Sequence, residues 1–278
     1  MVTLEELRAK HQKLIDGENS QGQGSGKSDY ASFKQESNLV RILPGKDDPL
    51  DFFVESHVHK YQEDGRWKSY HCRRIHNEAC PMCDLMWDLW KLHKDLNLPK
   101  GTKSKYGNLA TRIKARPRFY TRAVVRELVG QTDDAGAVVD PVKYVVMSDE
   151  LFQQVMGAIT DEDLQDEGDP DNTTILSLDR GNDFDIRITK KGDYNSFVTS
   201  KAKIKKIPAG TKQEIAAWMD SPLDVKALIS VPSYEDGKTI AQSLMAGLDT
   251  VEPSSPSKDE PSVKDSDSES EFKKNIEV

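Results

Sequence analysis

The sequence predicts a mainly β fold with inserted helices (α+β class), in which short strands form a Greek-key barrel. Two observations favour this class over a doubly wound parallel sheet. Short segments alternate apolar and polar residues and stop at turn residues, as residues 39–43 do before Pro44-Gly45. Strand-like and helix-like segments also do not alternate regularly, as they would in a doubly wound sheet. The chain has 278 residues, which is enough to bury a sizeable core.

The next two strand-like segments lie on either side of a tight turn. Residues 52–61 and 67–72 have strand character, and the turn residues Asp64-Gly65 lie between them, so we expect a hairpin. Further segments with strand character are residues 112–129, 138–147, 175–178, 184–189 and 197–207. Residues 130–136 are expected to join the first two of these as a hairpin loop.

Helical signatures occur at five places. Thr3 and Glu6 form a capping box at the start of a short amphipathic helix, residues 3–16. Residues 84–96 repeat apolar residues at helical spacing. The other helices are expected to begin at Ser148, Thr211 and Ser233.

Composition divides the chain into a folded core and two terminal segments. Residues 1–37 contain the first helix and the Gly/Ser-rich stretch 17–31, which predicts a flexible arm. Residues 38–250 form the predicted core. Residues 251–278 are dominated by Pro, Ser and acidic residues, so we expect a disordered acidic tail.

Membrane insertion and secretion are not expected. No apolar run approaches the roughly 18 residues of a membrane-spanning helix, and the first residues are polar rather than signal-like. The chain has three cysteines, all within residues 72–83. An odd, clustered set is a poor disulfide framework and a good metal set, which predicts a reducing, cytosolic compartment.

The charge of the chain is strongly polarised. The net charge is −8, yet residues 101–126 carry eight Lys/Arg and no Asp/Glu. Residues 127–200 sum to −12. The mean charge therefore hides a concentrated cationic segment, and an acidic total does not exclude a polyanionic ligand.

The cysteines and a histidine have the spacing of a metal site. The pattern is His59-x12-Cys72-x7-Cys80-x2-Cys83, and Cys80-Pro81-Met82-Cys83 supplies a knuckle that can grip one tetrahedral ion. His59 and Cys72 can meet across the predicted hairpin. A Cys₃His set leaves no open position, which predicts one structural Zn²⁺.

The cysteine part of this prediction is better determined than the histidine. His57 has the same strand parity as His59 and is an alternative ligand, and His71 and His76 also lie near the cysteines. Three buried free cysteines without a metal would be the plain structural alternative.

The cationic segment is interleaved with aromatic residues. On a strand, Arg112, Lys114, Arg116 and Arg118 would all lie on one face, because side chains alternate with period two. A cationic face that follows phosphates, beside exposed rings that stack on bases, is typical of single-stranded nucleic-acid binding. A solvated charged strand with its rings in the core is the alternative.

Phosphate contacts and base stacking are assigned as follows. The expected phosphate contacts are Lys103, Lys105, Arg112, Lys114, Arg116, Arg118 and Arg122. The expected stacking rings are Tyr106, Phe119 and Tyr120, with Tyr194 and Phe197 as weaker candidates from a later strand. Phe119 and Tyr120 point to opposite faces of a regular strand, so the register decides which ring faces solvent.

These features, in this order, resemble the single-stranded DNA-binding (helix-destabilising) protein family of T-even-like phages. The resemblance covers about residues 38–210. It is carried by residues 39–44, by His59 eight residues before Trp67, by the three cysteines, by the segment 114–125, and by residues 181–188.

The resemblance implies an OB-fold with an inserted zinc subdomain at about residues 55–97. It further implies self-association along the strand through the N-terminal arm, and recruitment of replication and recombination proteins by the acidic tail. The expected role is coating and protecting single-stranded DNA in phage replication, recombination and repair, in the cytoplasm of the host bacterium.

We expect a binding protein and not an enzyme. A zinc-containing nuclease or primase-like enzyme would need convergent carboxylates or an open metal position, and the sequence offers neither convincingly. A zinc-stabilised adaptor for protein interactions is the remaining alternative. Binding to oligo(dT) compared with duplex DNA across a salt series distinguishes the three functions.

Overall fold

The computed structural model describes residues 28–249 except 167–168, 174 and 193. The predicted first helix and acidic tail lie outside these residues. No helix in the described part of the chain is long and apolar enough to cross a membrane.

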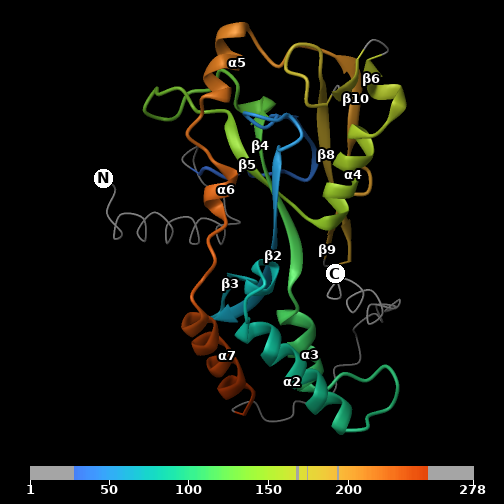
Figure 1. The fold of residues 1–278 in the computed structure, drawn as a ribbon, viewed down its shortest axis with the longest axis vertical. Helices are drawn as coiled ribbons and strands as arrows, with labels where there is room; N and C mark the ends of the chain where they lie inside the picture. The colour runs from blue at the N-terminus through green and yellow to red at the C-terminus, as the bar shows by residue number, and fades with distance from the viewer. Residues whose placement is uncertain (1–27, 167–168, 174, 193, 250–278) are drawn as a thin grey trace.

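A curled, antiparallel sheet forms most of the molecule (Figure 1). The strand order is β10-β8-β1-β4-β2-β3, with β5 also paired to β4 and β9 to β8. The bounds are β1 (Glu36–Ile42), β2 (Phe53–Glu63), β3 (Arg66–His71), β4 (Arg116–Val125), β5 (Val142–Met147), β8 (Asn182–Lys191), β9 (Tyr194–Ser196) and β10 (Lys201–Lys206). A separate two-stranded sheet pairs β6 (Gln165–Asp166) with β7 (Asp169–Thr173). The mainly β class with inserted helices is thus confirmed.

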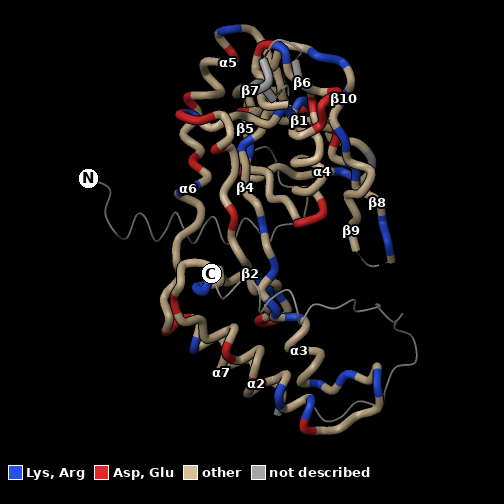
Figure 2. The backbone as a smooth tube through the Cα atoms, turned by 45° about the vertical axis from the view of Figure 1, so that its right-hand side comes forward, with Lys and Arg blue, Asp and Glu red and all other residues tan. Residues whose placement is uncertain are grey.

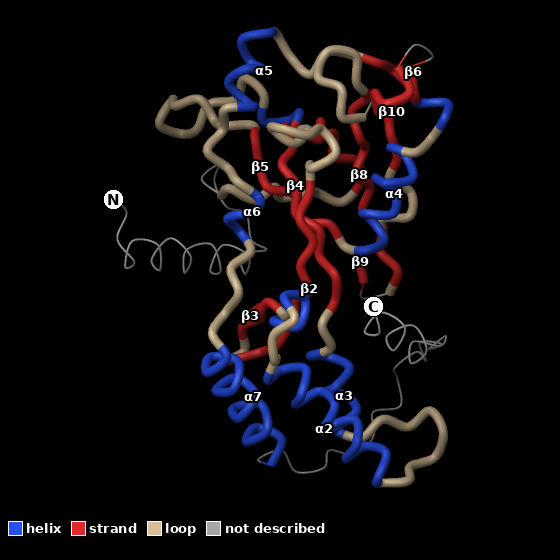
Figure 3. Tube along the Cα trace, viewed as in Figure 1, coloured by secondary structure: helices blue, strands red, loops and turns tan. Residues whose placement is uncertain are grey.

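Helices α2, α3 and α7 lie at the lower end of this sheet and α5 at its upper end, while α4 and α6 lie beside its strands, as Figure 3 shows. The bounds are α2 (Pro81–Asp95), α3 (Lys105–Ile113), α4 (Asp149–Ile159), α5 (Lys212–Met219), α6 (Val225–Leu228) and α7 (Tyr234–Asp249), with the 3₁₀ turns η1 (Arg73–His76), η2 (Arg126–Leu128) and η3 (Glu162–Leu164). Helices α2, α3 and α7 form a lobe at the lower end, which we call the helical lobe. The long strands β2 and β4 reach it from the body of the sheet (Figure 1).

Two large apolar cores correspond to the body and the lobe. In the body, α4 places Leu151, Phe152 and Val155 against residues of β1, β4, β5 and β8. The rings of Phe119 and Phe152 stack there with their centroids 3.7 Å apart. In the lobe, α2 and α3 pack with Tyr61 and Tyr70 of the hairpin, and α7 covers this cluster. Burial of both faces explains why the strands here are largely apolar.

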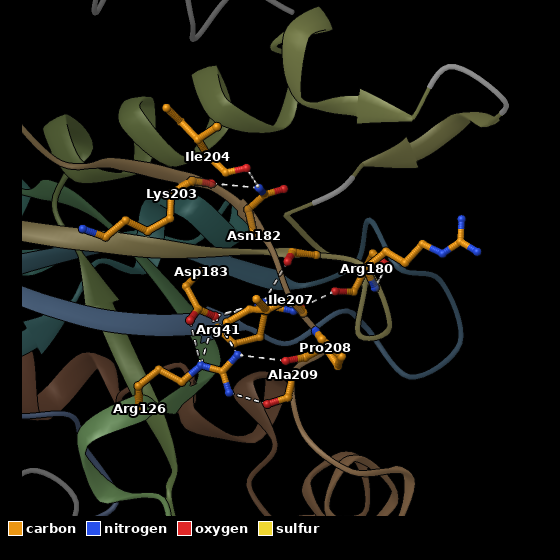
Figure 4. Close-up of polar contacts among 12 residues, drawn as sticks. Arg41, Arg126, Arg180, Asn182, Asp183, Lys203, Ile204, Ile207, Pro208 and Ala209 are labelled. Carbon is orange, nitrogen blue, oxygen red and sulfur yellow. Dashed lines mark hydrogen bonds and ion pairs between the residues drawn. The ribbon is translucent and has the colours of Figure 1, made fainter.

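A buried charge network fixes loops of the body to β1 (Figure 4). The guanidinium of Arg41, fully buried, donates to Asp183 Oδ1 at 3.0 Å and to the carbonyl oxygens of Gly181 and Ile207. Arg126 donates to the same carboxylate at 2.7 Å. Buried charges persist when they are paired and fully hydrogen-bonded, so Asp183 of β8 holds Arg41 of β1 and Arg126 of η2, and these two arginines in turn donate to the chain leaving β10.

Several local predictions are confirmed. Strands β2 and β3 form the expected hairpin, with Asp64 and Gly65 at positive φ in its turn. Ser148 caps α4 by accepting from the Leu151 amide, and Thr211 with Glu214 forms the capping box of α5.

Other local predictions are wrong. Residues 112–129 are not one strand: α3 extends to Ile113, β4 begins at Arg116, and η2 follows. Residues 175–178 form turns, and β5 begins only at Val142. The end of the predicted flexible stretch is held on β5, because the Ala31 amide donates to the Tyr144 carbonyl oxygen.

Candidate functional site

Four buried ligand atoms converge where the hairpin meets the helical lobe. His59 comes from the middle of β2, Cys72 follows β3, Cys80 is the N-cap of α2, and Cys83 lies in its first turn. Their ligand atoms all lie within 4.8 Å of one another. His59 Nε2 is 3.4 Å from Cys80 Sγ, and Cys72 Sγ is 3.5 Å from Cys83 Sγ.

The donor set fits one tetrahedral ion. Zinc bonds of about 2.3 Å to sulfur and 2.0–2.1 Å to nitrogen place neighbouring ligand atoms about 3.4–3.8 Å apart. The separations of 3.4 Å and 3.6 Å from His59 Nε2 to the sulfurs of Cys80 and Cys83, and of 3.5 Å between the sulfurs of Cys72 and Cys83, agree with this spacing, and the widest pair lies within 4.8 Å. Four soft or borderline donors without a carboxylate favour zinc-like cations over magnesium or calcium. The four-residue set predicted from sequence is therefore brought together as one candidate metal centre.

The electrostatics of the cluster also favour a cation. Burial acts to lower the pKa of His59, but hydrogen bonds and charge interactions with Cys72 and Cys80 outweigh it and raise that pKa to about 9. Hydrogen bonds from Cys72 and Cys83 lower the pKa of Cys80 despite its burial. Hydrogen bonds with Cys72 and Cys80 raise the pKa of Cys83. The Cys80 thiolate beside His59 thus stabilises a positive charge, which a divalent ion supplies more strongly than a proton.

The other nearby histidines face elsewhere. His57 Nε2 contacts Glu55 Oε1 at 3.0 Å, and His71 Nδ1 contacts Ser56 Oγ at 2.7 Å. His76 is exposed on η1. His59, and not His57, is therefore the fourth member of the cluster.

The predicted cationic residues fall on three consecutive elements. Lys103 lies in the α2–α3 connection, Lys105 and Arg112 lie on α3, and Arg116 and Arg118 lie at the start of β4. The expectation of one strand face is wrong for Arg112 and Lys114, because Ser104 caps a helix whose Leu109, Ala110 and Ile113 pack into the lobe. Tyr106 is half-buried against the same core.

Phe119 and Tyr120 are both buried, which corrects the expectation that one of these rings faces solvent. Phe119 packs under α4, while Tyr120 on the opposite face packs with Val225 and Leu228 around α6. The two faces of β4 are thus both covered at this level of the strand. Neither ring is available for base stacking in this conformation.

Arg122 is also buried, so its expected phosphate contact is wrong for this structure. Its guanidinium nitrogen Nη1 donates to the Leu223 carbonyl oxygen, and burial lowers the pKa of the side chain. Arg126 forms an ion pair with Asp183. Within the described ranges, no ion pair involves Arg112, Lys114 or Arg116, which keeps their charge available to an anion.

Sheet register adds residues that sequence reasoning missed. Val58 lies opposite both Arg116 and His71, Lys60 lies opposite Ser69, and Gln62 lies opposite Trp67. Opposed residues share a face, so these side chains lie on the same face as Arg116 and Arg118. We call this the cationic sheet face, defined by Lys60, Trp67, Ser69, His71, Arg116 and Arg118. Counting outward from the Asp64-Gly65 turn would have identified it.

The weaker stacking candidates lie on the β8–β9 hairpin. The ring of Tyr194 is 67% exposed, whereas Phe197 is half-buried and packs partly on the body core. Figure 2 shows Lys and Arg along β4, at the free end of β8 and along the α2–α3 connection. Of the two rings, Tyr194 is the one accessible to a ligand.

Comparisons with known proteins agree with this arrangement. No curated protein matches the chain. A family model described as gp32 DNA binding protein like matches residues 34–245, which is well over half of the chain. The match spans the sheet, the metal cluster and the cationic segment. The chain therefore belongs to the gp32-like DNA-binding protein family.

Proposed function

We propose that the protein binds single-stranded DNA without base-sequence specificity, and coats and protects it during phage replication, recombination and repair. Membership of a DNA-binding family supports the ligand class. The observation that carries the proposal is the segment 96–126, which holds nine Lys/Arg and no acidic residue. Its cations at the surface extend from the α2–α3 connection to the start of β4.

Phosphate contacts supply the affinity in this proposal. The phosphates of the DNA strand contact six cations: Lys103, Lys105, Arg112, Lys114, Arg116 and Arg118. Tyr106 and Tyr194 are the rings that we propose to stack on bases. Because backbone contacts carry no base information, binding tolerates any sequence. The protein lowers the melting temperature of duplex DNA, since it binds unpaired strands preferentially.

The ion of the metal centre is zinc in this proposal, and its role is structural. Four protein donors complete a tetrahedral shell, which leaves no position for a catalytic water. This supports a binding protein over a zinc-dependent nuclease. His59, Cys72, Cys80 and Cys83 hold the ion, and the ion in turn fixes the hairpin to α2.

The terminal segments complete the proposed role. Residues 1–37 mediate the association of neighbouring copies of the protein along the DNA strand. Residues 251–278 recruit replication and recombination proteins. Both assignments follow from the family resemblance. The site of action is the cytoplasm of the host bacterium.

A titration with oligo(dT) and duplex DNA across a salt series tests this function. With six phosphate contacts at about −0.7 each, log K should fall with log[salt] at a slope of roughly −4.2. Arg116→Ala should weaken binding to all sequences and reduce the slope by about 0.7. Lys212→Ala, on exposed α5, is the matched control and should change neither quantity. Equal affinity for duplex and single strands, or DNA cleavage with divalent metal, would contradict the proposal.

A further inference from the structure

We infer that Trp67 is a base-stacking site, and that the DNA strand continues from the α3–β4 cations across the cationic sheet face to the end of the β2–β3 hairpin. This inference rests on the proposed single-stranded DNA binding. It identifies a ring that can stack on bases in place of the buried Phe119 and Tyr120.

The exposure of Trp67 distinguishes it from the other rings of this region. Its side chain is 48% exposed, while Phe119 and Tyr120 are 6% and 2% exposed. Trp67 also lies on β3, an edge strand of the sheet, so it has a neighbouring strand on one side only. A large, rigid indole ring that is about half exposed offers apolar aromatic surface to a planar ligand.

The charges around Trp67 favour a polyanion. Lys60 lies diagonally across the hairpin on the same face as Trp67, whereas the exposed Arg66 lies opposite Glu63 on the other face. Glu63 pairs with Lys68, and both have the opposite strand parity. Asp64, in the turn, is the remaining acidic residue of the hairpin end. A phosphate chain therefore meets more cations than carboxylates along this face.

The distance between Trp67 and Arg116 suits a single DNA strand that runs diagonally over the sheet. Trp67 and Arg116 are separated by two strand spacings and by four residues of register, through Val58 and His71. At about 4.8 Å per strand and 3.4 Å per residue, their backbones are about 17 Å apart. Arg118 lies two residues further along the same face. A short run of nucleotides can thus place phosphates at the arginines and a base at the indole.

Side-chain chemistry predicts how the contact behaves. Stacking uses the ring face, tolerates every base and depends little on salt. Removal of one such ring typically weakens binding by about 5- to 150-fold, at ten-fold for each 1.4 kcal/mol. The phosphate contacts remain, so the salt slope should stay at its wild-type value.

The test compares two tryptophans of similar exposure in the full-length, metal-loaded protein. Trp67→Ala should weaken oligo(dT) binding about 5- to 150-fold at unchanged salt slope, and Trp67→Phe should restore most of the loss. Trp87→Ala is the control, because Trp87 is 42% exposed but lies on α2 in the helical lobe. It should bind like wild type. Oligo(dT) should also quench less fluorescence in Trp67→Phe than in Trp87→Phe.

The outcomes separate this inference from the proposed function. Wild-type affinity in Trp67→Ala, or equal loss in Trp67→Ala and Trp87→Ala, overturns the role of Trp67 and leaves DNA binding intact. Failure of the wild-type protein to prefer oligo(dT) over duplex overturns both. Equal metal content and melting temperature across the variants confirm that folding is unchanged, and the fluorescence comparison stands independently of the alanine variant.

Discussion

His59 Nδ1 lies 2.7 Å from the carbonyl oxygen of Ile113, the last residue of α3. The imidazole therefore contacts the helix that carries Arg112, while its other nitrogen faces the three thiols. An N–H donated from Nδ1 to this carbonyl fixes the tautomer that presents Nε2 to an ion. The metal centre thus reaches the cationic segment through a single hydrogen bond.

Removal of the metal should therefore loosen the helical lobe and weaken DNA binding together. Without an ion, the four buried ligands lose their common partner, and local structure around residues 57–95 should become sensitive to protease. Chelation followed by limited proteolysis and oligo(dT) titration of the same sample measures both effects. A native preparation that binds DNA but contains no stoichiometric metal would contradict the structural role.

His59→Cys separates metal retention from the contact with Ile113. The variant keeps a fourth donor for the ion but removes the imidazole that reaches the helix end. It should retain metal and bind oligo(dT) more weakly, because one buried hydrogen bond, about 0.5–1.5 kcal/mol, no longer positions the α3–β4 junction. Metal analysis and titration check this. Unchanged affinity with full metal content would show that the contact does not position Arg112.

Two glycines of α7 provide a matched test of how this helix closes the lobe. A Cβ added at Gly237 would lie 2.4 Å from Tyr70 Oη, whereas nothing lies within 4 Å of one added at Gly247. Gly237→Ala should destabilise the protein by about 1–3 kcal/mol through overpacking. Gly247→Ala should be neutral or stabilise it by up to about 1 kcal/mol through helix propensity. Denaturant unfolding measures both. Equal effects would exclude close packing of α7 on Tyr70.

The four residues of the candidate metal centre could be predicted because their chemistry is local in sequence. Two cysteines separated by two residues define the knuckle, and the hairpin turn places Cys72 beside β2. Only the choice between the two histidines required the structure, because His57 and His59 are two residues apart on one strand and so have the same face parity. The fold class was also predictable, because turns and alternation recur along the chain.

The exposure of the aromatic residues could not be predicted in the same way. Phe119 is covered by Phe152 and Tyr120 by Leu228, residues far away in the sequence. Similarly, the alternation of residues 112–118 is compatible with a strand, but Ser104 and the apolar spacing of Leu109 and Ile113 produce a helix. Long-range packing decided the first case, whereas in the second a local helix cap and helical apolar spacing outweighed the alternation.

Asp183 should be essential for stability, because it is the carboxylate between two arginines. Arg41 is fully buried and donates to Asp183, to Gly181 and to Ile207. Asp183→Ala leaves this guanidinium without its counterion, so the free energy of unfolding should fall by about 3–5 kcal/mol. Denaturant unfolding of the metal-loaded protein measures the loss. A loss below about 1 kcal/mol would show that the carbonyl oxygens alone satisfy Arg41.

Asp185 should contribute to acid unfolding of the body. Burial acts to raise the pKa of Asp185, but hydrogen bonds from Lys203, Ser37 and Arg187 outweigh it, so this pKa is lowered. The unfolded chain therefore takes up this proton more readily than the folded one. The stabilisation is present above the unfolded value of about 3.9 and is lost as pH falls below it.

Asp185→Asn tests this contribution through the slope of stability against pH. The variant should be less stable than wild type at pH 7, and the difference should shrink as pH falls below about 3.9. Asp51→Asn is the control, because Asp51 and its partner Lys226 are both exposed at the surface. Denaturant unfolding across pH 2–7 measures the slopes. A difference between Asp185→Asn and wild type that stays constant over this range would mean that the folded pKa of Asp185 is not lowered, and that the amide acts only by disturbing the packing around Lys203.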